Sequence, residues 1–189
     1  MFDEKGQLHT LEGVAAATIL LLVIVYAIDA TSMTPLTSST SSLHVEYELR
    51  TLGQDVLNMM DYAEPGYNSA LKNSILQWDG NEYIWNGSAY IIKGGTSPLT
   101  NSSLAAILVT TLARQGIAHN VAITFLDNGT PVSRNMIYNG DPSFSAVVVS
   151  RKIVLQNTDS NNPGNPIKDI DPSTNLYNVV DVKLILWRT

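Results

Sequence analysis

Residues 8–28 read LHTLEGVAAATILLLVIVYAI. From Val14 onward this run contains no charged residue, and its polar groups are two hydroxyls. A helix that is apolar on every face has to be covered on every face, either by lipid or by a bundle of like helices. At 1.5 Å per residue the run forms about 30 Å of helix, enough to cross the hydrocarbon of a membrane. We therefore predict a long hydrophobic N-terminal helix over residues 8–34 that carries the rest of the chain.

Proline and a run of hydroxyl residues separate this helix from the remainder of the chain. Pro35 removes a backbone donor and disfavours helical structure in the residue before it, so a kink is expected there. Thr37 to Ser42 are all Ser or Thr, which suits either a flexible linker or the N-cap region of the next helix. The expected organisation has four parts: a short leader at 1–7, the hydrophobic helix at 8–34, a kink or linker at 35–42, and a head domain at 43–189.

The head domain combines helical and strand patterns. Apolar residues at alternating spacings of four and three predict one amphipathic helix, and Asn86-Gly87 between two aromatic and β-branched runs predicts a hairpin. The final residues alternate between apolar and polar side chains, as in a half-buried strand. The expected elements are helices at 43–62, 70–76 and 98–116, a hairpin at 83–92, and strands at 119–127, 132–138 (an edge strand), 143–156 and 176–188. We predict an α+β fold, with a head domain of antiparallel β-sheet and covering helices.

The composition excludes several classes of function. The 189 residues carry a formal net charge of −6, and Lys and Arg are not clustered. Phosphate binding needs clustered cations, so we expect no nucleic-acid partner. The absence of cysteine excludes disulfides, thiolate catalysis and zinc–sulfur sites.

No motif indicates catalysis, a metal or a cofactor. The histidines His9, His44 and His119 lie in different expected elements and form no ligand pair. Phosphate loops, nucleophile elbows and zinc-protease motifs are all missing from the sequence. The polar loop at 157–175 is rich in Asp and Asn, but the twelfth position counted from Asp159 is Ile170 instead of the glutamate of an EF-hand. We therefore expect a protein that is not an enzyme and holds no cofactor.

Three sequence motifs can accept N-linked glycans. Asn86, Asn101 and Asn128 each begin an Asn-x-Ser/Thr sequence, and each lies at an expected turn or helix start. If the head domain faces the outside of the cell, we expect a glycan on at least one of them.

Glu12 is the acidic residue at the start of the hydrophobic run. An unpaired carboxylate in an apolar bundle costs several kcal/mol or takes up a proton. The α-amine of a neighbouring subunit is a natural partner, and such a pair would set the register of subunit assembly. The alternative is that Glu12 marks a membrane boundary.

Lys5-Gly6-Gln7, Glu12 and the apolar run together resemble the N-terminus of archaeal type IV pilin-like proteins that carry a class III signal peptide. The resemblance implies that a prepilin-type peptidase cuts the short leader near Lys5, Gly6 and Gln7. It also implies that the helix becomes the packing core of a filament built by a pilus assembly machinery. The residues expected in that core are Val14, Ile19, Leu20, Leu21, Leu22, Val23, Ile24 and Val25.

The sequence thus predicts a structural subunit of an archaeal type IV pilus-like extracellular filament. Its expected partners are copies of itself, and the membrane before assembly, where the helix is inserted. Its expected location is the cell surface. The alternative is a single-pass membrane-anchored binding module or a minor component of a secretion or adhesion system.

Overall fold

The structure is a computed structural model that describes residues 13–25, 36–99, 102–159 and 162–188. The chain divides into two compact units, Met1–His44 and Val45–Thr189. The described part of the first unit consists of a helix at residues 13–25, which we call the apolar helix, and the start of helix α2 (Leu36–Asp61). Helix α2 therefore includes most of the 35–42 range that the sequence assigns to a kink or linker.

The second unit is built on one six-stranded sheet. Its strands are β1 (Tyr83–Trp85), β2 (Tyr90–Ile92), β3 (Ile117–Asp127), β4 (Thr130–Ile137), β5 (Val147–Gln156) and β6 (Leu176–Arg188). The strand order is β2-β1-β4-β3-β6-β5, so β2 and β5 are the edge strands. All pairs are antiparallel except β1 with β4, which meet in parallel at Tyr83 and Ile137.

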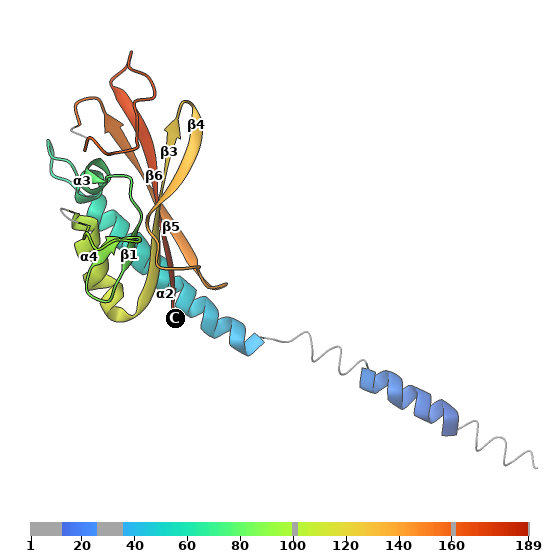
Figure 1. Ribbon diagram of the computed structural model, residues 1–189. Coiled ribbons are helices and arrows are strands. Elements are labelled where there is room, and N and C mark those ends of the chain that lie inside the picture. Colours follow the sequence, from blue (N-terminus) through green and yellow to red (C-terminus); the bar gives the residue numbers. More distant parts are fainter. Residues whose placement is uncertain (1–12, 26–35, 100–101, 160–161, 189) are drawn as a thin grey trace, which may run out of the picture. The chain divides into compact units, whose positions relative to one another are not determined.

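Helices α2, α3 (Ala70–Gln77) and α4 (Ser103–Thr111) lie on one face of this sheet (Figure 1). Side-chain caps start the two shorter helices, because the hydroxyls of Ser69 and Ser102 accept hydrogen bonds from the backbone N–H three residues ahead. A 3₁₀ turn, η1 (Ala113–Gln115), follows α4 and ends at Gly116, whose φ of 70° suits glycine.

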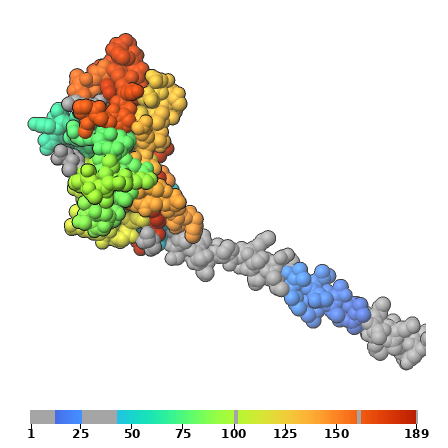
Figure 2. Space-filling model, in the orientation of Figure 1, coloured from blue at the N-terminus to red at the C-terminus, as the bar shows by residue number. Residues whose placement is uncertain are grey.

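The core lies between these helices and the covered face of the sheet. Alternate residues of β5 and β6 point into it and are buried, whereas Val148 and Val154 on the opposite face of β5 are about half exposed. In the space-filling view, the residues of β1, β2 and α4 form one continuous surface (Figure 2). The buried side chains of α2 are Leu49, Val56, Leu57 and Met60.

The predicted fold class is wrong in two respects. First, the sheet is mixed, because α4 and η1 intervene between the β1–β2 hairpin and β3 and allow β1 to join β4 in parallel. Second, no long apolar helix is present in the described residues. The apolar helix has 13 residues and rises about 20 Å, about two thirds of a hydrocarbon core.

Among the residues that the structure describes, no helix combines the length and the hydropathy needed to cross a membrane. The expectation of a transmembrane, pilin-like N-terminal helix is corrected accordingly. The expected edge strand at 132–138 is corrected in part: β4 lies between β3 and β1, but its register with β1 is confined to Ile137.

Candidate functional site

The second unit contains a pocket of about 550 Å³ near the parallel junction of β1 and β4. Three segments that are far apart in sequence form it: strand β1, the turn from η1 into β3, and the residues that follow β4. Lys93, which directly follows β2 in the β1–β2 hairpin, also lines the pocket. The lining residues are Ile84, Trp85, Lys93, Ala113, Gly116, Ile117, Ala118, His119, Tyr138, Asn139 and Gly140.

Two asparagines hold these segments together. The amide oxygen of Asn139 accepts a hydrogen bond from Trp85 N at 2.7 Å, and its Nδ2 donates to the carbonyl oxygen of His119 at 2.6 Å. Asn120, which is buried, accepts from Asn139 N at 2.7 Å and donates to the carbonyl oxygen of Gly140 at 2.9 Å. These amides are engaged by the protein itself, so their role is to position the backbone on both sides of the pocket.

His119 lines the pocket with both ring nitrogens in hydrogen bonds. Its Nδ1 is 3.1 Å from the carbonyl oxygen of Ile117, which can only accept, so Nδ1 carries the proton. Its Nε2 then accepts from the hydroxyl of Tyr90 at 2.5 Å. Burial lowers the pKa of His119 and raises the pKa of Tyr90, so both groups are neutral near pH 7. His119 thus has no free nitrogen with which to bind a ligand or transfer a proton.

An ion pair includes Lys93 of the pocket lining. Lys93 Nζ is 2.5 Å from Glu82 Oε1 and 5.4 Å from the centroid of the Tyr138 ring. The hydrogen bond from Lys93 lowers the pKa of Glu82, whose second oxygen accepts from Asn135 Nδ2 at 3.1 Å. The Tyr138 hydroxyl donates to Asp141. The Lys93–Glu82 pair is thus neutral overall and remains open to solvent, with Lys93 59% exposed.

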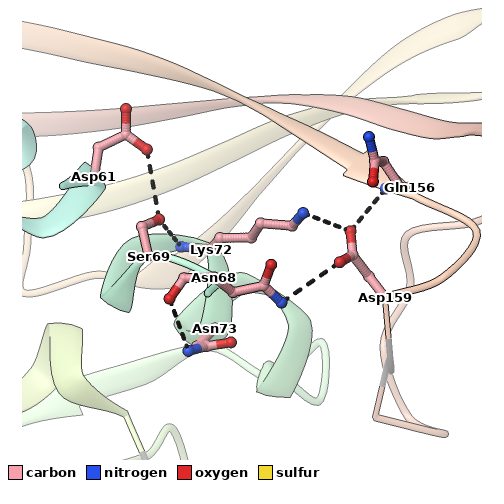
Figure 3. Close-up of polar contacts among 7 residues, drawn as sticks. All are labelled: Asp61, Asn68, Ser69, Lys72, Asn73, Gln156 and Asp159. Carbon is pink, nitrogen blue, oxygen red and sulfur yellow. Dashed lines mark hydrogen bonds and ion pairs between the residues drawn. The ribbon is translucent and has the colours of Figure 1, made fainter. Parts of the chain in front are cut away.

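A second polar cluster joins α2, α3 and the end of β5 (Figure 3). Lys72 Nζ lies 2.8 Å from Asp159 Oδ2, with the two side chains only 15% and 7% exposed. Asp159 Oδ2 also accepts from Gln156 N at 2.7 Å, and Oδ1 accepts from Asn68 Nδ2 at 3.4 Å. The carboxylate of Asp159, near the start of the Asp-rich loop, is therefore engaged by contacts within the protein. No group of three or more potential metal-binding residues occurs within the described ranges.

The residues predicted from the sequence to form functional sites are not brought together. Val14 and Ile19 to Val25 lie on the apolar helix and are 45–67% exposed. Asn86 and Asn128 are exposed in turns, where Asn86 Oδ1 accepts from the backbone of Ser88 and Ala89 and Asn128 has a φ of 50°. Lys5, Gly6, Gln7, Glu12 and Asn101 lie outside the described residues.

Sequence reasoning misses the pocket residues. It assigns Trp85 only to a hairpin and Tyr138 only to a strand, and it gives Lys93 and Asn139 no role. Within the hairpin, Tyr90 is 2% exposed in the core whereas Trp85 is half-buried, and no local pattern distinguishes the two aromatic residues.

The buried His119 predicts a pH dependence of stability. Its pKa in the folded protein lies below the ordinary value of 6.5 because of burial, which outweighs the hydrogen bond to Ile117. The unfolded chain therefore binds the proton more readily, so the free energy of unfolding falls as the pH drops below about 6.5, by at most about 1.4 kcal/mol per pH unit.

Urea denaturation between about pH 5 and about pH 7.5 would measure how the free energy of unfolding changes with pH. This range lies above the one in which the titration of carboxylates dominates that change. The His119→Gln variant has no titrating side chain at position 119. The slope of its unfolding free energy between about pH 5 and about pH 7.5 should therefore be smaller. An unchanged slope in the variant would show that another group is responsible.

Two comparisons with known proteins found a match, and a third found none. A family model described as "Family of unknown function (DUF7288)" matches residues 5–186. An uncharacterized protein of Archaeoglobus fulgidus is 31% identical over 190 residues, which cover 99% of this chain and 94% of that protein. No solved structure matches the chain.

Proposed function

Because the chain belongs to the DUF7288 family, whose function is unknown, we propose its function from the structure. The protein is a structural subunit of an archaeal surface filament and assembles with copies of itself through the apolar helix. The observation that supports this is the exposure of that helix, whose residues are exposed in an unbroken run from 13 to 25.

The side chains on every face of the apolar helix need a partner. Val14 is 67% exposed, and the seven consecutive residues Ile19 to Val25 are 45–65% exposed. Seven consecutive positions occupy all sides of a helix with 3.6 residues per turn. Fully burying one Val, Leu or Ile side chain contributes about 1.5–3 kcal/mol, so leaving all of them in water is strongly unfavourable.

A bundle of copies covers such a helix better than the head of its own chain can. Docking against a folded domain buries one face of a helix, whereas a helix surrounded by like helices is covered on all sides. The exposed large apolar side chains of the second unit are also scattered over α2, two loops, β5 and β6, and include Tyr62, Tyr67 and Phe144. The relative from Archaeoglobus fulgidus, an archaeon, supports the archaeal setting.

A surface location is supported by two glycan acceptor sequences on the head. The structure exposes Asn86 and Asn128 at turns, which leaves room for a bulky attached group. This part of the proposal predicts a mass increase on peptides that contain either residue when the protein is taken from its native cells.

An acidic substitution in the apolar helix tests the assembly. We expect Leu21→Asp to lower the association constant by more than about 100-fold, because a carboxylate buried in an apolar contact costs several kcal/mol. Negative-stain electron microscopy and sedimentation velocity of the full chain would measure polymer formation. The unfolding midpoint of the second unit should not change.

Val148→Asp provides a matched control. Val148 is 53% exposed on β5, so this variant adds the same charge at a comparable exposed apolar position outside the helix. It should assemble like the original chain. The proposal fails if the unmodified chain stays monomeric at high concentration, if Leu21→Asp assembles normally, or if Val148→Asp abolishes assembly to the same extent.

A further inference from the structure

We propose that the pocket beside Trp85 binds a neutral sugar ring, which stacks on the indole and directs a hydroxyl group toward Lys93. This inference goes beyond filament assembly and does not rest on it, since every residue involved belongs to the second unit. It would make the head a glycan-binding module.

The size and lining of the pocket suit a small ligand. Its volume of about 550 Å³ falls within the roughly 300–1,000 Å³ typical of ligand sites. Ile84, Ala113 and Ala118 provide apolar walls, and a few polar groups lie among them. An apolar pocket with a few placed polar groups is the usual form of a small-molecule site.

Trp85 supplies an available aromatic surface. The chain has three tryptophans, of which Trp78 and Trp187 are 0% and 5% exposed, whereas Trp85 is half-buried and lines the pocket. Its ring packs against Tyr90 with centroids 5.1 Å apart and planes tilted by 57°. Its backbone N–H is held by Asn139. The indole is thus positioned before a ligand arrives, which lowers the entropic cost of binding.

The Lys93–Glu82 ion pair favours a neutral ligand over a charged one. Lys93 Nζ lies 2.5 Å from Glu82 Oε1, so an anion attracted by the ammonium would be repelled by the carboxylate, and a cation attracted by the carboxylate would be repelled by the ammonium. A hydroxyl group can accept from the ammonium and donate to the carboxylate at the same time. The inner polar groups of Asn139 and His119 are already engaged, so recognition depends on the ammonium of Lys93, which is 59% exposed and has N–H groups left to donate.

A sugar ring combines the two properties that this arrangement selects. Its C–H face is apolar and fits against an aromatic ring, and its edge carries neutral hydroxyl groups that both donate and accept. A purely aromatic ligand would use Trp85 but leave the ion pair with poorer hydrogen bonding than water provides. We therefore expect sugars to bind better than charged aromatic molecules of similar size.

Ligand-observed NMR on the full chain tests the inference. The probes are the methyl glycosides of glucose, galactose, mannose and N-acetylglucosamine, with benzoate and benzylamine as anionic and cationic comparators. At least one glycoside should show saturation transfer and a dissociation constant below about 20 mM, tighter than both comparators. Running the same titration on Leu21→Asp separates this result from assembly, because the pocket should keep its affinity even if that variant stays monomeric.

Substitutions at Trp85 and Lys93 locate the binding. Trp85→Leu should weaken binding about tenfold or more through loss of stacking, and Trp85→Phe should restore part of the affinity. Lys93→Met should weaken it by about threefold to tenfold. Lys152→Met is the matched control, because Lys152 is also an exposed lysine paired with a carboxylate, but it lies on β5 outside the pocket lining.

The inference is overturned if no glycoside binds, if benzoate or benzylamine binds more tightly, or if Trp85→Leu and Lys93→Met both bind like the original chain. Circular dichroism of each variant shows whether it is folded. Since Lys93 is exposed and its substitution removes no core contact, Lys93→Met keeps the test decisive even if Trp85→Leu fails to fold.

Discussion

Asp159→Ala should lower the free energy of unfolding by about 3–5 kcal/mol, the range for removing one partner of a buried ion pair. The substitution leaves the ammonium of Lys72, only 15% exposed, without its carboxylate. It also removes the acceptor for Gln156 N and Asn68 Nδ2. Urea denaturation followed by circular dichroism would measure the loss.

A double-mutant cycle separates the ion pair from the rest of the cluster. Lys72→Met alone should be costly, because it leaves the carboxylate of Asp159, 7% exposed, without its cation. The double variant should lose less than the sum of the two single variants, by about 1–3 kcal/mol of coupling.

Arg188→Met is the control for this cycle. Its guanidinium pairs with Glu48 at 3.3 Å, but both side chains are about half exposed, so the change should be within about 1 kcal/mol. Equal losses in Arg188→Met and Asp159→Ala would show that burial does not strengthen the Lys72–Asp159 pair.

Gly53→Val should destabilise the second unit by about 3 kcal/mol or more, through overpacking between α2 and the sheet. A Cβ at Gly53 would lie 2.6 Å from Leu186 Cδ1 and 2.9 Å from Val149 Cγ2. Leu186 is fully buried and has little room to move. Gly53→Ala should cost less, because alanine gains up to about 1 kcal/mol of helix propensity.

Thr51→Val is the matched control for this contact. It places the same residue on the same helix at an exposed position, and thermal unfolding should change little. If Gly53→Val melts at the temperature of the original chain, the close approach of helix and sheet at this glycine is incorrect.

The same glycine explains which face of α2 is buried. Hydrophobic spacing favours Met59 as a core residue, yet Met59 is 59% exposed and Leu57 is fully buried. The centre of the buried face is Gly53, which contributes nothing to a hydrophobic pattern. The face of α2 that packs on the sheet is therefore set by how closely the helix backbone can approach the sheet. The spacing of large apolar residues does not indicate this distance.

The pocket is unpredictable from the sequence for a related reason. Trp85 and Lys93 belong to the β1–β2 hairpin and Tyr138 follows β4, and the two segments meet because β1 joins β4 in parallel. Local patterns predict hairpins well, since the turn Asn86-Gly87 and the apolar runs on both sides of it are close together in the chain. They do not indicate that a hairpin will attach to a strand that is distant in sequence.

Properties that depend on composition and local order can be read from the amino-acid sequence without a structure. These are the apolar character of residues 13–25, the α+β mixture of elements, the hairpin turns at Asn86 and Asn128, and the lack of a phosphate or zinc motif. The mixed strand order, the helix face centred on Gly53, the burial of the Lys72–Asp159 pair and the pocket beside Trp85 emerge only in the folded chain. The physical reason is that hydrophobic periodicity and turn chemistry act within a few residues, whereas strand order and close packing depend on which distant surfaces fit together.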